Sequence, residues 1–524
     1  MRKILTLVLV WIVLPLSAQD GSSVSQLQKL LQVYRYLDGM YVDEVEMAPL
    51  VESAIAGMLD ELDPHSAYIG PEEMKGVQES FDGEFSGIGI EFDVLRDTVV
   101  VVNTISGGPA ERVGMRPGDR IVRIDTTDAV GFGRADVPRY LRGRRGSKTD
   151  VEVVRRGEPG KLRFTVERDR IPLNTVDAAY MAADGIGYIR INRFGRTTMS
   201  EFRDAYRTLG RPRHLILDLR GNGGGLLEQA VELAEFFLPR GALIVSTEGR
   251  AVPSSSFRAR YDGENLDGRL AVLLDEASAS ASEIVAGAVQ DWDRGVIVGR
   301  PSFGKGLVQR QIGLGDGSAV RITIARYHTP SGRVIQRPYE NGKRREYYLD
   351  HGRRSGEAGD SSEAGAPAYR TLRTHRTVYG GGGIRPDILV EADTTGFSDY
   401  YAGLIRRGVV NEYVAAYMDG VRDSLGAFYP AFETFGRRYE VSDAMLEALV
   451  RLGAERGIER DEKSLTRSAP LMKTQLRALV AQRLFGVGAF CRVMNGAEND
   501  ACSRAVRVLE NWEREGRPLL GMEK

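Results

Sequence analysis

The stretch Leu270-Ala-Val-Leu-Leu-Asp-Glu-Ala-Ser-Ala-Ser-Ala-Ser-Glu-Ile-Val-Ala-Gly-Ala288 contains an apolar strand, a turn of small residues and the start of a helix. This order is typical of one unit of an α/β layer fold. Upstream, the pattern predicts strands at Gly187–Ile191 and Leu215–Leu219 and a helix from Leu226. We therefore expect an α/β fold over about residues 175–345.

Ser280 lies where the predicted helix of this stretch begins. Unpaired backbone N–H groups at a helix N-terminus favour negative charge, which suits a nucleophile beside a developing oxyanion. The spacing of Ser280 and Glu283 is also that of a capping box, and capping is the more common use of this pattern. The segment alone leaves both roles open.

Lys305 lies between two glycines in Val296-Ile-Val-Gly-Arg-Pro-Ser-Phe-Gly-Lys-Gly-Leu-Val-Gln309, after another apolar strand. Glycines let backbones approach closely and leave an amine poorly hydrated, which lowers its pKa toward that of a base. A serine activated by lysine is a known alternative to Ser-His-Asp. Gln309, four residues on, would share a strand face with Lys305 and could hydrogen-bond its amine.

The same stretch matches the first seven positions of a P-loop, beginning at Gly299. The eighth position of that motif holds the Ser or Thr that binds magnesium, and here it is Gly306. The residues after it alternate like a strand, whereas a P-loop leads into a helix. Nucleotide binding is therefore disfavoured.

The stretch His214-Leu-Ile-Leu-Asp-Leu-Arg-Gly-Asn-Gly-Gly-Gly-Leu-Leu-Glu228 again runs from a strand through a glycine turn into a helix. Exposed N–H groups of this turn could complete an oxyanion hole with the amide of Ala281. Taken alone, the turn is equally explained as a tight connection.

Two further stretches resemble the PDZ domain: Phe85-Ser-Gly-Ile-Gly-Ile-Glu-Phe92 and Ser106-Gly-Gly-Pro-Ala-Glu-Arg-Val-Gly-Met-Arg-Pro-Gly-Asp-Arg-Ile-Val-Arg-Ile-Asp125. The glycine loop of a PDZ domain presents backbone N–H groups to a terminal carboxylate, and the peptide adds as an extra strand. The resemblance assigns that role to Gly87, Ile88, Gly89 and Ile90.

Taken together, Ser-Ala-Ser-Ala-Ser-Glu-Ile, Phe-Gly-Lys-Gly-Leu-Val-Gln and Asp-Leu-Arg-Gly-Asn-Gly-Gly-Gly resemble the carboxyl-terminal processing proteases, also called tail-specific proteases. The resemblance runs from about Leu27 to Val390 and includes the motifs at 57–68 and 382–388. It implies that Ser280 is the nucleophile, Lys305 the base and Gln309 the residue that orients the lysine.

The same resemblance places the oxyanion donors on the amide of Ala281 and on one glycine of residues 223–225, with Gly224 preferred over Gly225. Ser278 and Ser282 then have structural roles. The resemblance also implies that the catalytic core is an α/β fold akin to the crotonase superfamily.

Arg2 and Lys3 precede the apolar run Ile4–Leu16, which is followed by small residues. This pattern predicts a secretory signal peptide over residues 1–18, and the run is too short for a membrane-spanning helix. An uncleaved anchor or a buried helix is the alternative. We expect export to the periplasm or cell envelope.

The rest of the chain divides into four regions. We expect helices at 24–83, an inserted β-rich PDZ domain at 84–168, the catalytic core at 171–394 and a helical C-terminal region at 397–524. Residues 351–367 of the core, rich in Gly, Ser, Glu and Ala, read as a flexible insertion. For the C-terminal region, packing, partner docking and homo-oligomer formation remain open.

The composition indicates which classes of binding partner and cofactor are not expected. The 524 residues include 71 basic and 72 acidic ones, with 42% apolar and 27% charged, an ordinary globular balance. Near-zero net charge gives no reason to expect nucleic acid or an anionic membrane. The five histidines lack metal-ligand spacing, so neither a metal nor another cofactor is expected.

The two cysteines, Cys491 and Cys502, lie near the C-terminus. In an exported protein they could form one disulfide that closes a small loop, and two unpaired thiols fit equally well. No histidine pattern surrounds them, so neither catalysis nor metal binding is indicated.

The sequence thus predicts an exported serine endopeptidase that binds free C-terminal tails of proteins or peptides and cleaves through an acyl-enzyme. One alternative is a non-catalytic PDZ scaffold. Such a protein would be expected to lack Ser280 or Lys305, and both residues are present. Another is a serine hydrolase with a histidine base, for which His328 is the nearest downstream candidate. The sequence does not identify the physiological substrates.

Overall fold

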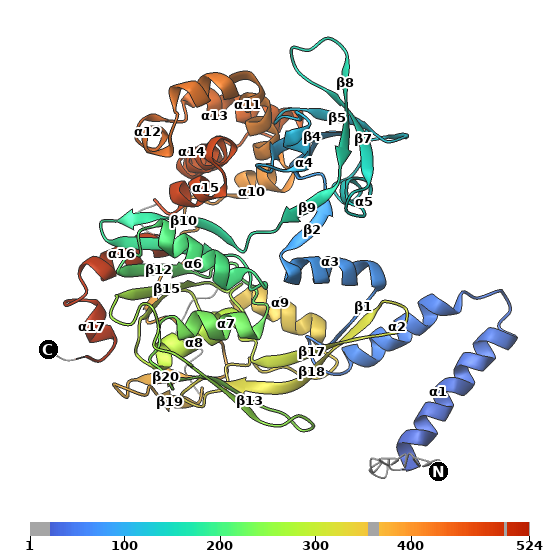
Figure 1. The fold of residues 1–524 in the computed structure, drawn as a ribbon, viewed down its shortest axis with the longest axis vertical. Coiled ribbons are helices and arrows are strands. Elements are labelled where there is room, and N and C mark those ends of the chain that lie inside the picture. Colours follow the sequence, from blue (N-terminus) through green and yellow to red (C-terminus); the bar gives the residue numbers. More distant parts are fainter. Residues whose placement is uncertain (1–20, 355–365, 497–499, 523–524) are drawn as a thin grey trace, which may run out of the picture.

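The computed structural model describes residues 21–354, 366–496 and 500–522 (Figure 1). The chain forms N-terminal helices, a small β domain, a large α/β domain and a group of C-terminal helices. The signal peptide predicted over residues 1–18 lies outside the described residues. Within them, no helix combines the length and the apolar character that crossing a bilayer requires.

The α/β domain is built on a six-stranded sheet with the order β10-β11-β12-β15-β16-β21. β10 is antiparallel to β11, and the other neighbours are parallel. The strands are β10 Val176–Ala183, β11 Ile186–Ile191, β12 His214–Asp218, β15 Leu270–Leu274, β16 Val296–Gly299 and β21 Ile388–Leu389. The α/β alternation expected for residues 175–345 is present. All five residues of β15 are buried, as continuous apolar strands of parallel sheets usually are.

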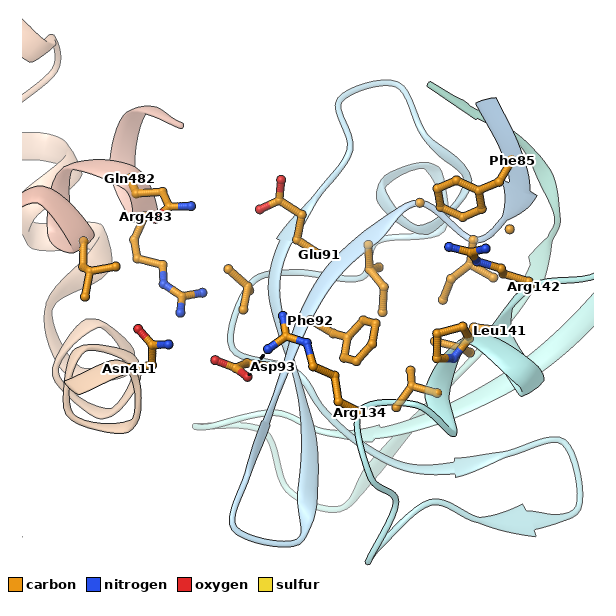
Figure 2. A pocket seen from close by; sticks show the side chains of 18 residues that line it. Phe85, Glu91, Phe92, Asp93, Arg134, Leu141, Arg142, Asn411, Gln482 and Arg483 are labelled. Atoms are coloured by element: carbon orange, nitrogen blue, oxygen red, sulfur yellow. Dashed lines mark hydrogen bonds and ion pairs between the residues drawn. The ribbon is translucent and has the colours of Figure 1, made fainter. Parts of the chain in front are cut away.

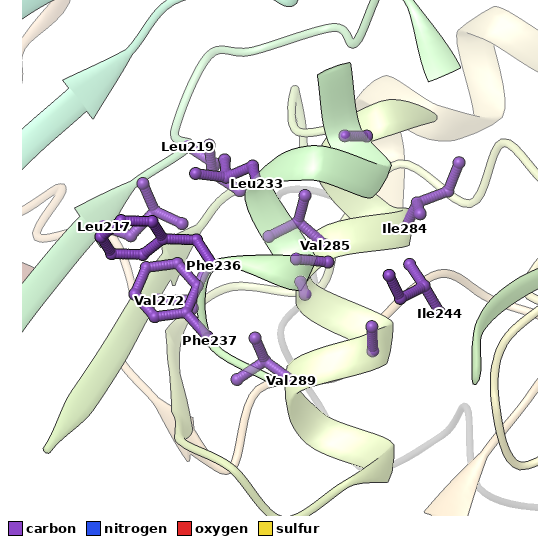
Figure 3. Packing of buried hydrophobic residues seen from close by; sticks show 14 of the residues in the cluster. Leu217, Leu219, Leu233, Phe236, Phe237, Ile244, Val272, Ile284, Val285 and Val289 are labelled. Carbon is purple, nitrogen blue, oxygen red and sulfur yellow. The ribbon is translucent and has the colours of Figure 1, made fainter. Parts of the chain in front are cut away.

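Helices cover both faces of this sheet (Figure 1). On one face lie α6 Thr198–Thr208, α7 Leu227–Glu235 and α8 Ala281–Asp291, and on the other α15 Val487–Met494 and α16 Ala501–Glu510, followed by α17 Gly516–Leu519. Figure 3 shows Phe236 and Phe237 packed beside α8, with Val285 and Val289 directed toward them. This packing anchors α8 on the sheet, and Ser280 is the N-cap residue of the helix.

A second sheet places part of the N-terminal region beside the strands that follow Lys305. Its strands are β1 Ala67–Ile69, β13 Leu243–Glu248, β14 Ser255–Arg258, β17 Leu307–Gly313 and β18 Ala319–His328, in the order β1-β18-β13-β14 with β17 also on β18. The pairing of β1 with β18 places the motif at 57–68 beside the strand hairpin that follows Lys305. The sequence patterns did not predict this sheet.

The PDZ domain stands on a two-stranded stalk formed by β2 Glu84–Gly87 and β9 Asp169–Pro172. Its sheet has the order β3-β4-β5-β7-β8, with β6 paired to β5. The elements are β3 Ile90–Leu95, β4 Thr98–Thr104, α4 Pro109–Arg112, β5 Arg120–Ile124, β6 Thr127–Asp128, α5 Val137–Leu141, β7 Lys148–Val154 and β8 Lys161–Glu167. The expected β-rich domain at 84–168 is therefore present, and β3 is an edge strand.

Both terminal regions are helical, as expected. The N-terminal helices are α1 Gly21–Met40, α2 Met47–Asp60 and α3 Pro71–Asp82, and α1 extends away from the rest of the chain (Figure 1). The C-terminal region contains α10 Asp399–Arg406, α11 Val409–Phe428, α12 Phe432–Arg438, α13 Asp443–Glu455 and α14 Glu462–Phe485, which share a core of their own.

The insertion expected at 351–367 lies mostly outside the described residues. Helix α9, Arg344–Arg354, includes its first four residues. After the gap the chain forms the hairpin β19 Ala368–Arg370 and β20 Thr377–Tyr379 before it returns to the main sheet at β21.

Candidate active site

Ser280 occupies a strained turn between β15 and α8. Its φ of 53° and ψ of −110° lie in a region that residues with a side chain rarely adopt. Such a conformation costs about 1–3 kcal/mol and persists only where the surroundings enforce it. Here the backbone N–H of Ala279 donates to Asn222 O at 3.0 Å, and Ser282 Oγ donates to the same carbonyl at 2.9 Å. The serine is held between two anchored neighbours.

The carboxylate of Glu283 connects the serine turn to the lysine segment. Its Oε2 accepts hydrogen bonds from the backbone N–H of Ser280 at 2.7 Å and of Lys305 at 2.9 Å. Its Oε1 accepts from the N–H of Gly304 at 2.7 Å and from Ser302 Oγ at 2.5 Å. Burial raises the pKa of Glu283 to about 7, against the opposing effect of these donors. The predicted capping pair is thus present and also connects the two segments.

Tyr327 makes a second connection between the same two segments. Its side chain is 1% exposed, and its hydroxyl donates to Lys305 O at 2.6 Å and lies 3.3 Å from Ser280 O. The structure therefore brings the main chains of Ser280 and Lys305 close together. The sequence had predicted that these two residues act together.

The surroundings of Lys305 lower the pKa of its amine. Burial lowers its pKa to about 8, the positive charge of Arg321 lowers it further, and Glu283 and Asp63 oppose both. Burial and the charge of Lys305 lower the pKa of His65 to about 3, so the imidazole is neutral. Sequence reasoning had used residues 57–68 as a family motif without placing Asp63 and His65 beside the lysine.

Gln309 does not make the hydrogen bond expected of it. Its Nε2 is buried without a hydrogen-bond partner among the described residues, and no bond to Lys305 is formed. Lys305 precedes β17, and the ladder with β18 has a register irregularity between Val308 and Gln309. The irregularity leaves Ile324 of β18 without a partner, and Lys305 lies outside β17, so the same-face argument, which assumed a regular strand from Lys305 to Gln309, does not apply here.

The glycine turn after β12 lies against the serine turn, as expected. Gly224 has a φ of +102°, and a Cβ there would lie 2.8 Å from Ser280 Cβ and 3.0 Å from Ala281 N. The expectation for its amide is not met in this conformation, because the N–H of Gly224 donates to Asn222 Oδ1 at 2.9 Å. The turn residue two positions upstream thus holds the donor that an oxyanion would need.

The other two serines of the triplet have the structural contacts expected of them. Ser278 Oγ donates to Leu219 O at 2.8 Å, and Ser282 Oγ binds Asn222 O. His328 lies on the strand beside Tyr327, where Nδ1 is 3.3 Å from Gly332 O and Nε2 is 3.7 Å from a Glu248 oxygen. Neither of these partners belongs to the serine turn.

The two cysteines are free buried thiols, so the disulfide alternative is not formed in this structure. Within the described part of the chain, no group of three or more His, Cys, Asp or Glu side chains has an arrangement that could hold a metal ion.

The predicted tail-binding loop lines a cavity. Gly87, Ile88, Gly89 and Ile90 border a space of about 470 Å³ together with β3 and α5. Gly89 has a φ of +76°, and a Cβ there would meet Ile171 Cδ1 at 2.9 Å, so the position requires glycine. The carbonyls of Ile88 and Gly89 accept hydrogen bonds from Ala110 and Ile105, which fix the loop on the domain.

Four family models match the chain. Peptidase family S41 matches residues 185–340, and the PDZ domain matches 86–166. The activating protease CtpB N-terminal domain matches 14–73, and a family of unknown function matches 400–486. The first two matches cover the strands and helices that carry Ser280 and Lys305, and the domain that carries the glycine loop.

Individual known proteins are also similar to this chain. A carboxy-terminal-processing protease of Bartonella bacilliformis is 37% identical over 60% of this chain and 74% of its own length. Carboxy-terminal processing protease CtpA of Bacillus subtilis is 33% identical over 61% of this chain and 68% of its own. The solved PDZ domain of a carboxy-terminal protease from Vibrio cholerae, in complex with peptide, is 30% identical over 17% of this chain and 99% of its own, with a TM-score of 0.17. The chain belongs to the carboxy-terminal processing proteases, which are serine-type peptidases of family S41 with a PDZ domain.

Proposed function

We propose that this peptidase uses Ser280 as nucleophile and Lys305 as general base. The observation that carries the proposal is the single oxygen, Glu283 Oε2, that binds the amides of both residues. A buried lysine with its pKa lowered to about 8 has a much larger neutral fraction near neutral pH than an exposed lysine, and the neutral amine is the form that can act as a base. Gln309 remains the candidate for orienting the lysine once substrate displaces the side chains around it.

In the proposed reaction, Lys305 Nζ takes the proton of Ser280 Oγ as the oxygen attacks the carbonyl carbon of the substrate. The tetrahedral intermediate collapses, the peptide C–N bond breaks, and the lysine returns its proton to the leaving amine. Water then gives up a proton to Lys305 and attacks the acyl-enzyme, which releases the new carboxylate and restores Ser280.

The oxyanion would be bound by the N–H of Ala281, the first of helix α8, and by the glycine turn. The Gly224 amide would have to leave Asn222 Oδ1, whose side chain is itself held by a hydrogen bond from its Nδ2 to Ile191 O at 2.9 Å. Binding of substrate would then compete with this internal hydrogen bond.

The dyad is tested by incubating the purified protein with an unstructured substrate that has a free C-terminal tail. Native protein should cleave it, and Ser280→Ala and Lys305→Ala should not, while both variants still bind the substrate. Cleavage by Lys305→Ala at nearly the native rate would remove the lysine from the mechanism.

We further propose that the loop Gly87–Ile90 binds the free carboxylate of a substrate tail and that the peptide adds to the edge of β3. The PDZ domain, joined to the core through β2 and β9, would act as a lid that a bound tail shifts toward the active arrangement. Amidation of the substrate's C-terminus should weaken both binding and turnover. Equal cleavage of the acid and the amide would refute tail reading.

Export to the periplasm or cell envelope is part of the proposal and is supported by the apolar run Ile4–Leu16. N-terminal sequencing of the mature protein should find a start near Gln19. A soluble cytoplasmic pool that retains Met1 would contradict export.

Homo-oligomer formation through the N-terminal helices is proposed from the exposed apolar side chains of α1. Leu27 is 58% exposed and Leu31 50%, on a helix that extends from the body (Figure 1). A second copy would bury this face. Light scattering on Leu27→Glu/Leu31→Glu should show a smaller particle than the native protein, and an unchanged mass would contradict the proposal.

A further inference from the structure

The cavity at the tail-binding loop is formed by two domains (Figure 2). The PDZ domain contributes the loop Gly87–Ile90, strand β3 and helix α5. The facing side is lined by Asn411 of α11 and by the end of α14, where Leu479, Gln482 and Arg483 lie. The C-terminal helices are therefore part of the groove wall.

Strand β3 separates the two sides of this cavity. Within the described residues it pairs with β4 alone, so its other edge is free to bind a peptide. Phe92 packs with the PDZ core on the side of α5, whereas Glu91 and Asp93 are directed toward the C-terminal helices (Figure 2). Side chains of an added strand alternate in the same way, so every second one would face α11 and α14.

Arg483 presents a positive charge on that side. Its partly buried guanidinium points toward β3 in Figure 2 and makes no ion pair or hydrogen bond with any described residue. Burial lowers the pKa of Arg483, and the charges of Asp93, Glu91 and Asp419 oppose this only in part. Asp93 also lies 3.3 Å from Arg134, and Glu91 also accepts from Asn103 at 3.1 Å. A half-buried cation of this kind gains from an incoming carboxylate.

The wall is fixed to the PDZ domain by polar contacts. Arg422 of α11 donates to Arg483 O at 2.7 Å and to Val102 O of β4 at 3.4 Å, so one side chain joins α11, α14 and the PDZ sheet. Arg120 of β5 pairs with Asp419 of α11 at 3.0 Å. Arg483 is thereby held at a defined place relative to β3.

We propose that α11 and α14 form the second half of the tail-binding groove, and that Arg483 selects substrate tails with Asp or Glu at the alternate positions that face it. This inference rests on the proposed tail capture by the loop Gly87–Ile90. It assigns a specificity role to the C-terminal helical region, for which the sequence offered no motif.

The test uses full-length Ser280→Ala protein and fluorescent peptides with an alanine-rich sequence and a free C-terminus. One Glu or one Gln is placed at each of the last five positions in turn, and affinity is measured by fluorescence anisotropy. We expect Glu to bind about five- to tenfold more tightly than Gln at positions two residues apart, and to match Gln between them. Arg483→Met in the same background should abolish the preference, and Arg451→Met, an exposed arginine on α13, should leave it intact.

Amidated peptides separate the two proposals. If amidation weakens binding to Ser280→Ala and to both arginine variants, tail capture stands and Arg483→Met is folded. Three results would then overturn the role of Arg483. The first is equal affinity for Glu and Gln peptides at every position. The others are a preference for Glu that survives Arg483→Met and a preference that is also lost in Arg451→Met. If amidation changes nothing in Ser280→Ala, tail capture itself fails.

Discussion

Oε2 of Glu283 accepts a hydrogen bond of 2.9 Å from the backbone N–H of Lys305, although the two residues lie on different segments of the chain. The helix that begins at the serine turn thereby fixes the main chain of the lysine. The sequence predicts that this carboxylate caps a helix, and in the structure it also binds a distant segment of the chain.

Glu283→Gln should therefore impair both stability and catalysis. An amide cannot accept from all four donors that now bind the carboxylate, and a buried donor without a partner costs about 1–3 kcal/mol. Since the negative charge of Glu283 raises the pKa of Lys305, its loss should also move the acid limb of the pH–rate profile to lower pH. Thermal unfolding and kcat against pH measure both effects. Glu228→Gln, the same change at an exposed position, should alter neither, and an unaffected Glu283→Gln would contradict this role.

The pH–rate profile of the native enzyme should rise with pH through about 8, as Lys305 loses its proton. Two variants should move this limb in opposite directions. Arg321→Ala removes a positive charge that lowers the pKa of Lys305, so the limb should shift to higher pH. Asp63→Asn removes a negative charge that raises it, so the limb should shift to lower pH. Shifts of the same sign would show that the limb does not report Lys305.

Tyr327→Phe should lower kcat while leaving KM nearly unchanged. The lost hydroxyl donates to Lys305 O at 2.6 Å, and its removal leaves a buried carbonyl without that donor, at about 1–2 kcal/mol. Steady-state kinetics with one peptide substrate measures the effect. Tyr206→Phe removes a buried hydroxyl that accepts from Asn265 at 3.2 Å, and should reduce stability without a matching loss of kcat. Equal kcat values for both variants would contradict a positioning role for Tyr327.

Cys491 and Cys502 should react slowly with thiol reagents in the native state. Both are buried, burial raises the pKa of each thiol, and that of Cys502 reaches about 12, so little thiolate exists at neutral pH. Labelling followed by mass spectrometry should find two free thiols that become reactive only on unfolding. Recovery of the unfolded, unreduced protein without free thiols would show instead that a disulfide forms.

The sequence predicted the parts of the site that depend on local patterns. Ser280 caps a helix after a buried strand, and Lys305 follows the next strand of the same sheet, because apolar runs and glycine turns specify these elements locally. Asp63 and His65 could not be placed in this way. Their position depends on the pairing of β1 with β18, which joins residues far apart in the sequence.

Two expected arrangements of hydrogen bonds are absent from this conformation. The same-face argument for Gln309 assumed a regular strand from Lys305 onward, and neither the late start of β17 nor its irregularity leaves a mark in the composition. The donor assigned to Gly224 is engaged by Asn222, a choice between hydrogen-bond partners that only coordinates reveal. The contact of the C-terminal helices with the PDZ domain was likewise beyond reach, because isolated arginines on helices do not identify their partners.

Gly486 both ends α14 and begins α15, with a φ of 85° and a ψ of −179° that only glycine adopts freely. One helix of this pair borders the PDZ groove and the other lies on the sheet of the catalytic domain. The turn between the two helices therefore consists of this single residue, while side-chain packing between them also sets their angle. A Cβ at this position would meet no atom within 4 Å, so alanine would strain the backbone without any clash. Such a substitution would therefore strain the turn between the helix that borders the PDZ groove and the helix on the catalytic sheet, and would leave every residue of both sites unchanged.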